Sequence, residues 1–230
     1  FRSPDRGESW TSASAGLHSS SITALAVDPQ ASSTVWAAAL GFAGSPRTGL
    51  FRSADAGLSW SLGSGPVSSP SFFVGSLAIS PERSSTIYAG GSGVYRSDDD
   101  GEHWTSSPLP VFNISTLAID PGSPDRVWAL GSGGLFRSDD GARSWTSDRV
   151  VAQDIYCLLF DARHPGTMYA GSYFDISSGF YPEPQGGSIF VSRDSGTSWT
   201  QMQRGFESTV LAIASDPFRD GVLYVGMYTG

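Results

Sequence analysis

The sequence predicts an all-β fold built from a repeated unit of four short strands, and three observations lead to this prediction. A turn motif, Ser-x-Asp-x-(Gly)-x-x-Trp, occurs five times, always with seven positions from Ser to Trp. Successive copies begin 41 to 54 residues apart, a spacing typical of multi-strand repeats. Between the copies lie short runs rich in β-branched and aromatic residues, separated by Gly and Pro, which favour strands over helices.

Each copy of the turn motif, here called a box, predicts the tip of a β-hairpin. The Asp can accept hydrogen bonds from backbone N–H groups of a tight turn, and the Gly two positions later can take the positive φ that the turn needs. The Trp then opens the returning strand, where burial between sheets contributes about 2–3 kcal/mol. In the fourth box Gly141 stands one place early and Ala142 replaces the usual Gly, so we expect a slightly altered turn there. The boxes occupy 3–10, 53–60, 97–104, 138–145 and 192–199.

The four strands of the unit are expected in a fixed order. The first is an apolar run that ends in a turn, and its lack of polar alternation indicates burial on both faces, as for an innermost strand. The third leads into the box, and the box Trp opens the fourth. We expect all seven Trp residues, which lie in boxes or second strands, to belong to the core. The first strands are expected at 25–29, 77–81, 117–121, 158–161 and 213–217, and each second strand carries one aromatic: Trp36, Tyr88, Trp128, Tyr169 or Tyr224.

The two ends of the chain continue the pattern. Residues 1–3 have a third-strand sequence and 223–226 a second-strand sequence, so together they make one more unit. We therefore expect a single domain over 1–230, a β-propeller of five four-stranded blades. Pairing the ends would close the ring and remove exposed sheet edges; the alternative is an open arc of a larger propeller. The expected blades are 210–230 joined to 1–15, then 22–62, 74–107, 114–148 and 154–203.

With its five boxes in register, the chain resembles the Asp-box, or bacterial neuraminidase repeat, propellers. That superfamily includes sialidases, xyloglucanase-type glycosidases, sortilin-like receptors and photosystem II assembly factors. The resemblance covers essentially the whole chain, and it implies that the boxes lie on the side away from the ligand-binding face. It does not identify an activity, because one fold hosts many functions.

Two lookalike motifs are better interpreted as scaffold. Phe1-Arg-Ser-Pro4 is similar to the Phe-Arg-Ile-Pro element that supplies a catalytic arginine in sialidases. However, Arg2 occupies the same repeat position as three other arginines, Arg52, Arg96 and Arg137. These arginines are therefore expected on blade surfaces. Asp98-Asp-Asp-Gly101 lacks the further oxygen ligands and distal Glu of a calcium loop. The three dispersed histidines do not support a Ser–His–Asp arrangement.

Composition restricts the partners. The net charge is −8, and all 14 basic residues are Arg, without a basic cluster, which argues against nucleic acid or anionic lipid. No apolar run is long enough to insert in a membrane. The single Cys157 cannot form an internal disulfide, and no Cys or His cluster has metal-ligand spacing, so no metal or cofactor is expected.

The residue usage is typical of a GC-rich bacterial gene. The chain begins inside a repeat at Phe1 without a signal peptide, and we expect an extracytoplasmic location with any targeting segment removed.

The candidate binding residues lie in connections on the face opposite the boxes. Two long insertions occur there, at about 41–48 and 172–187, and they combine aromatic residues with a few charges. Loops on a rigid scaffold commonly carry function, although these rings could instead pack on one another to hold the loops. The candidate acids for a glycosidase, which needs two carboxylates, are Asp154, Asp175 and Glu183. The candidate ligand-binding residues are Phe42, Arg47, Tyr173, Phe174, Asp175, Phe180, Tyr181 and Glu183.

The sequence favours a non-catalytic interaction module that binds a protein or a glycan through this aromatic loop face. Aromatic anchors with few charges suit the core of a protein interface, and the same rings could stack on sugars. Two alternatives stay open. One is a glycoside hydrolase of the sialidase or xyloglucanase type. The other is an accessory or assembly subunit of a membrane complex, which the resemblance to photosystem II factors implies.

Overall fold

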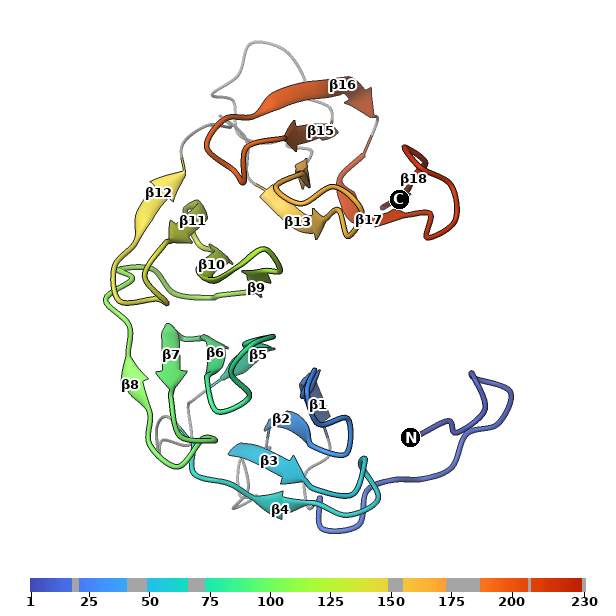
Figure 1. Ribbon diagram of the computed structural model, residues 1–230, viewed down its shortest axis with the longest axis vertical. Helices are drawn as coiled ribbons and strands as arrows, with labels where there is room; N and C mark the ends of the chain where they lie inside the picture. Colours follow the sequence, from blue (N-terminus) through green and yellow to red (C-terminus); the bar gives the residue numbers. More distant parts are fainter. Residues whose placement is uncertain are drawn as a thin grey trace.

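The computed structural model describes residues 1–17, 21–40, 49–65, 73–148, 155–172, 187–206 and 208–228. This part of the chain is all-β: four antiparallel sheets of four strands and one of two strands follow one another around an arc (Figure 1). Within the described ranges, no helix is long and apolar enough to cross a membrane. Each four-stranded sheet is a blade whose first strand faces the central opening.

The strands run in chain order from the inside of each blade to its outside. Blade 1 contains β1 (Ser21–Val27), β2 (Val35–Leu40), β3 (Gly49–Ser53) and β4 (Ser61–Leu62). Blade 2 contains β5 (Val74–Ile79), β6 (Ile87–Gly91), β7 (Val94–Ser97) and β8 (Thr105–Ser106). Blade 3 contains β9 (Thr116–Asp120), β10 (Ser123–Gly131), β11 (Gly134–Ser138) and β12 (Thr146–Asp148). Blade 4 contains β13 (Ile155–Phe160), β14 (Met168–Ser172), β15 (Gly187–Ser192) and β16 (Thr200–Phe206). The two-stranded sheet contains β17 (Val210–Ser215) and β18 (Leu223–Met227).

The box turns have the predicted chemistry. In the second box, Ser53 Oγ donates to Asp55 Oδ1 at 2.7 Å and accepts from the Gly57 N–H at 2.8 Å. Ser59 donates to both carboxylate oxygens of Asp55, through its N–H at 2.8 Å and its hydroxyl at 2.5 Å. Ala56 and Gly57 both have positive φ, 59° and 86°. The predicted hairpin tip between third and fourth strands is therefore confirmed, with two left-handed positions rather than one.

The fourth box forms the same turn as the others. Ala142 N–H donates to Ser138 Oγ at 2.8 Å, and Ser144 donates to both oxygens of Asp140. Because the turn has two adjacent positions of positive φ, Gly141 takes the first and Ala142 the second, with φ of 70° and 65°. The predicted alteration of the turn is limited to a smaller φ at Ala142, because the glycine occupies the first of the two positive-φ positions instead of the second.

The boxes of blades 2, 3 and 4 also contact the second-strand aromatic of the preceding blade. A Cβ added to Gly196 of blade 4 would lie 2.2 Å from two ring carbons of Trp128 in blade 3, and one on Gly101 of blade 2 would lie 2.5 Å from Trp36 in blade 1. Where the preceding aromatic is the smaller Tyr88, Ala142 fits, and both lie in one buried cluster. The box residue and the aromatic are thus matched in size between neighbouring blades.

The seven Trp residues differ in burial, which corrects the expectation that all of them are core. Trp36 and Trp128 are fully buried between blades. The box Trp residues lie nearer the rim, and Trp10 is 61% exposed. Trp104 Nε1 donates to Ser64 O at 3.0 Å and Trp145 Nε1 to Ser107 Oγ at 2.6 Å, so each ties its blade to the segment that leaves the preceding one.

The first strands are less buried than their apolar sequences predict. Leu77 and Ile79 of blade 2 are buried against blade 1, but Leu25 and Val27 at the same positions of blade 1 are exposed. The prediction of burial on both faces is therefore wrong for these residues, because an inner strand is covered only where a neighbouring blade packs on it.

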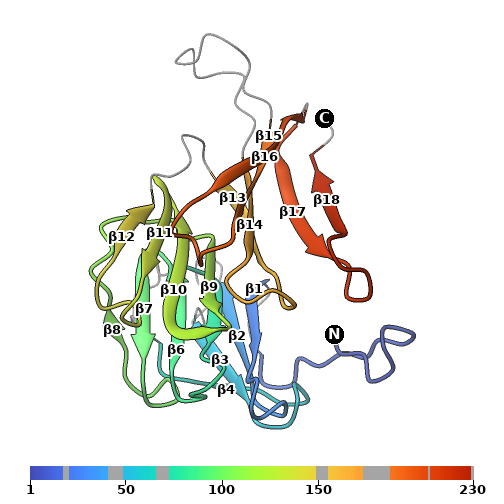
Figure 2. The same ribbon diagram turned by 45° about the horizontal axis from the view of Figure 1, so that its top comes forward.

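The two ends of the arc carry incomplete blades. Residues 1–17 form a hairpin closed by Arg2 and Thr11 and contact blade 1 through a bridge between Ala15 and Ser59. At the other end, β17 and β18 pack on blade 4 without a third strand among the described residues. Figures 1 and 2 place these two pieces at opposite ends of the arc. The blade shared by both termini therefore stays a prediction, and the arrangement seen is the open arc.

Candidate functional site

The candidate site residues all fall in segments outside the described residues. These are the ligand-binding candidates Phe42, Arg47, Tyr173, Phe174, Asp175, Phe180, Tyr181 and Glu183, and the further candidate acid Asp154. Their roles stay predictions. The structure does describe the strand ends from which their segments leave.

These strand ends are paired within their sheets and lie opposite the boxes. In blades 2 and 3 the second and third strands are joined by two residues only, 92–93 and 132–133, whereas blades 1 and 4 have 41–48 and 173–186 at the same place. In blade 4 the last residue of β14, Ser172, is fully buried, and its Oγ accepts a hydrogen bond from Ser188 N at 2.8 Å. Because successive strands are antiparallel, this connection leaves from the end of the sheet opposite the box.

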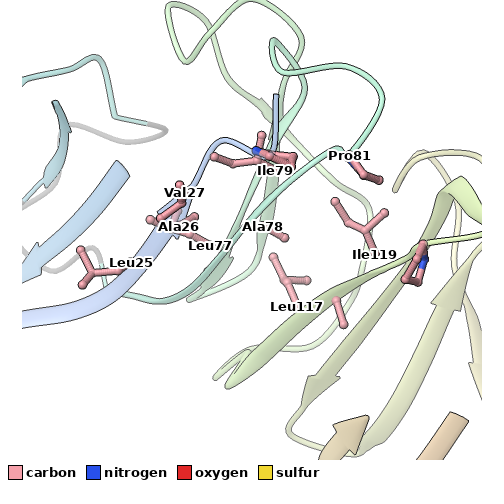
Figure 3. Close-up of a pocket in the computed structure, with 12 residues that line it drawn as sticks. Leu25, Ala26, Val27, Leu77, Ala78, Ile79, Pro81, Leu117 and Ile119 are labelled. Atoms are coloured by element: carbon pink, nitrogen blue, oxygen red, sulfur yellow. The ribbon is translucent and has the colours of Figure 1, made fainter. Parts of the chain in front are cut away.

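A second feature is an apolar hollow on the inner strands, which the sequence did not predict as a site. It has a volume of about 330 Å³ and lies where β1, β5 and β9 face the central opening (Figure 3). The prolines that follow these strands place it toward the box side. Its lining is entirely aliphatic or proline: Leu25, Ala26, Val27, Pro29, Leu77, Ala78, Ile79, Pro81, Leu117, Ala118, Ile119 and Pro121. The repeated apolar-Asp-Pro run was the signal available, but it was interpreted as core.

Hydroxyl groups join the inner strands beside this hollow. Thr23 Oγ1 of β1 donates to Val74 O of β5 at 2.5 Å, and Leu117 N of β9 donates to Ser76 Oγ of β5 at 2.8 Å. The hollow is therefore bounded by strands that are linked directly to one another. Its aliphatic walls can bind apolar groups, and none of the residues that line it can donate or accept a proton through its side chain.

The box aspartates are ionised turn residues. Asp5, Asp55, Asp140 and Asp194 each have a pKa lowered from 3.8 to about 2, chiefly because a Ser hydroxyl and the N–H of the same Ser donate to the carboxylate. The pKa of Asp99 is lowered to about 2 by the backbone N–H and the ring of His103. Their oxygens are engaged in the turns, so these acids are scaffold.

The third-strand arginines are more deeply placed than predicted. Arg96 is buried between blades, where its guanidinium lies 5.7 Å from the centroid of the Tyr88 ring and donates to Gly141 O at 2.5 Å. It also donates to Asp98, whose pKa it lowers. Arg137 similarly lies 5.9 Å from the Trp128 ring centroid. The expectation of surface residues was wrong for Arg96, although the assignment to scaffold agrees with these contacts.

The other reactive side chains are dispersed. In the described ranges, no three His, Cys, Asp or Glu residues are grouped so as to hold a metal ion. His103 Nδ1 lies 2.7 Å from Asp99 Oδ2, which raises the histidine pKa. His164 Nδ1 lies 3.1 Å from Asp161 Oδ2. Burial between blade 4 and β17 raises the pKa of the Cys157 thiol, whose Sγ is 3.6 Å from Val210 O.

Comparison with known proteins identifies the fold. No protein-family model and no curated protein matches the sequence. A GH74 enzyme from Niastella koreensis superposes with a TM-score of 0.55 at 17% identity, over 78% of this chain and 38% of its own. An ancestral GH74 enzyme superposes with a TM-score of 0.59 at 18% sequence identity, over 82% of this chain and 26% of its own. YCF48 bound to a D1 peptide superposes with a TM-score of 0.61 at 14% sequence identity, over 93% of this chain and 62% of its own.

The chain thus spans less than two thirds of the length of each of these structures. All of them are β-propellers, and their repeated antiparallel blades correspond to the arc of four-stranded sheets seen here. At identities below one fifth the similarity shows the fold and not the activity. The protein therefore has a β-propeller fold.

Proposed function

We propose that this protein is a non-catalytic interaction module that binds a protein partner through the loop face opposite the boxes. The observation that carries the proposal is the unequal length of one connection. Two residues suffice to join second and third strands in blades 2 and 3, yet blades 1 and 4 have 41–48 and 173–186 between equally well-paired strands. Because the scaffold does not need the extra residues, we assign them to binding.

The composition of these segments supports a protein partner. They contain Phe42, Tyr173, Phe174, Phe180 and Tyr181 with few charges. Aromatic side chains supply large contact areas and are enriched at the cores of protein interfaces, where charged residues are depleted. The similarity to YCF48, which has been solved with a D1 peptide, gives a protein of this fold that binds a peptide. An extracytoplasmic location and membership of a larger assembly are part of the proposal.

A capture experiment tests the proposal. The wild-type chain is immobilised and used to recover proteins from native extract, in parallel with a variant that carries Tyr173→Ser, Phe174→Ser, Phe180→Ser and Tyr181→Ser. The matched control carries Leu58→Ser and Phe218→Ser, which remove exposed apolar side chains on the box side. We expect the loop-face variant alone to lose the partner. Equal recovery by all three proteins would overturn the assignment of the face.

A second candidate function is glycoside hydrolysis, which the GH74 structures favour because two of the matched structures are such enzymes. It needs two carboxylates about 5–10 Å apart, and the candidates are Asp154, Asp175 and Glu183. Turnover of xyloglucan fragments or fluorogenic sialosides that disappears in Asp175→Ala or Glu183→Ala would establish this function and refute the non-catalytic one. We expect the wild-type chain to show no such turnover.

A further inference from the structure

The apolar hollow on the inner strands also presents main-chain groups. Each of β1, β5 and β9 is the innermost strand of its blade and is paired on one side only, with β2, β6 or β10. The other edge of each strand faces the central opening (Figure 1). Since no residue that lines the hollow has a polar atom in its side chain, every polar atom that the hollow offers is a backbone N–H or C=O.

A hydrogen bond at the end of β1 shows which of its main-chain groups point to the opening. Asp28 N–H donates to Thr34 O at 3.0 Å, which lies on the β2 side of blade 1. In an antiparallel pair, residues alternate between bonding to the partner strand and pointing away from it. The register therefore turns the N–H and C=O of Leu25 and Val27 toward the opening, and those of Ala26 toward β2.

Strand β5 repeats this arrangement. Ser80 N–H donates to Thr86 O at 2.9 Å, on the β6 side of blade 2. Because the residues alternate, the main-chain groups of Leu77 and Ile79 point toward the opening and those of Ala78 toward β6.

Strand β9 shows the direction of its edge directly. Leu117 N–H leaves the sheet of blade 3 and donates to Ser76 Oγ of blade 2 at 2.8 Å. Ile119 stands two residues further on, so its N–H and C=O point the same way. Within the described ranges, the edge N–H groups of Val27, Ile79 and Ile119 have no acceptor. The hollow thus combines aliphatic walls with main-chain donors and acceptors that are available for binding.

This combination restricts what the hollow can bind. Aliphatic walls favour apolar groups, and an unpaired strand edge offers a row of donors and acceptors that matches another extended backbone. A fatty acyl chain would cover these main-chain groups without replacing their hydrogen bonds to water, which is unfavourable. A sugar or a charged ligand would find neither a polar side chain nor an aromatic ring among the lining residues. An extended peptide with aliphatic side chains satisfies both the walls and the edge.

We propose that the hollow binds an extended, aliphatic segment of a partner protein, which pairs with the inner edge of β5 and packs its side chains against β1 and β9. β5 is the middle strand of the three, and lining residues of β1 and β9 lie on either side of it (Figure 3). Leu77 and Ile79 stand two residues apart, so their N–H and C=O groups can pair with alternate residues of the added strand.

This site is separate from the loop face. Three neighbouring inner strands alone form the hollow, so the site does not depend on what lies across the central opening. The prolines among its lining residues follow the inner strands on the box side, whereas the segments 41–48 and 173–186 leave from the opposite ends of the blades. A partner can therefore occupy either site without the other.

Hydrogen exchange of the full chain, followed by nuclear magnetic resonance, tests the proposal with the synthetic peptide acetyl-Val-Ser-Val-Ser-Val-amide. Saturating peptide should slow exchange at the amides of Leu77 and Ile79 at least about tenfold, because these amides become bonded. The amides of Ala78 and Ser80, which are already bonded within blade 2, serve as internal controls and should not change. Absence of protection at Leu77 and Ile79, or protection elsewhere only, would overturn the proposal.

Two further probes separate backbone pairing from simple apolar binding. The same peptide with every backbone nitrogen methylated keeps its aliphatic side chains but has no N–H donor, and sodium decanoate is an acyl chain without amides. Both should bind at least about tenfold more weakly than the unmodified peptide, since neither can pair fully with a strand edge. Equal binding of either probe would mean a general apolar hollow and would refute the pairing.

A wall variant places the peptide in this hollow rather than elsewhere on the protein. Leu25→Ser with Val27→Ser changes two lining side chains that are 62% and 56% exposed, so the fold should tolerate it. It should weaken binding of the peptide about tenfold through lost apolar contact. Leu58→Ser, which removes a leucine of similar exposure outside the hollow, should leave the affinity unchanged. Unchanged affinity in the wall variant would contradict the site, whatever the capture experiment shows for the loop face.

Discussion

Gly196→Ala tests the size match between a box and the aromatic of the preceding blade. Two costs are expected. The alanine must adopt a φ of +78°, a left-handed conformation that costs an L-residue about 1–2 kcal/mol. Its Cβ would also lie 2.2 Å from two carbons of the Trp128 ring, which is fully buried and cannot move aside freely. Such overpacking costs about 1–3 kcal/mol, so a total loss of about 2–5 kcal/mol in the free energy of unfolding is expected.

Gly57→Ala is the matched control for this prediction. Gly57 occupies the same box position with a φ of +86°, but the nearest atom to an added Cβ is 3.5 Å away, an ordinary contact. The control therefore has the conformational cost alone and should lose about 1–2 kcal/mol. Urea unfolding followed by far-UV circular dichroism gives both values, provided that the m-values agree. Equal destabilisation of the two variants would refute the steric match between Gly196 and Trp128.

Three further predictions concern the same scaffold. Because the box aspartates have a pKa of about 2 when folded and 3.8 ordinarily, they stabilise the fold fully above about pH 4, and the urea midpoint should fall as the pH is lowered from 4 to 2. Ser192→Ala removes the bonds to Asp194 and the Gly196 N–H from a buried site and should cost about 1–3 kcal/mol, measured by calorimetry. The Arg96 guanidinium lies over the Tyr88 ring and donates to Gly141 O, and a lysine cannot make both contacts, so Arg96→Lys should lower the thermal unfolding midpoint of the protein. Arg143→Lys, at an exposed site, should leave that midpoint unchanged.

The repeat itself could be predicted from the sequence because its residues act locally. A box requires hydrogen bonds and positive φ within a few neighbouring positions, so Ser53, Asp55 and Gly57 were sufficient to predict the turn. The place of Trp36 in the core followed from its recurrence in the second strand. Even the exchange of Gly141 and Ala142 was recognisable, although its effect on the turn was overestimated.

Features that depend on neighbouring blades could not be predicted. The sequence of β1 resembles that of β5, yet Leu25 is exposed and Leu77 is buried, because only the second has a blade in front of it. Likewise, the sequence predicts that a box Trp belongs to the core, but its burial depends on how far the preceding blade covers it. Trp10 has no preceding blade in the described structure and is exposed. The apolar hollow arises from three separate inner strands, so no single segment indicates it.

The proposed binding face is tested most directly by the affinity of a partner identified in the capture experiment. Its dissociation constant is measured by titration calorimetry for wild type, for the loop-face variant in which Tyr173, Phe174, Phe180 and Tyr181 become Ser, and for the box-side variant in which Leu58 and Phe218 become Ser. We expect the loop-face variant to bind at least about tenfold more weakly, since aromatic anchors dominate interface energies, and the box-side variant to bind as wild type does. Loss of affinity in the box-side variant, with the loop-face variant unchanged, would contradict the account.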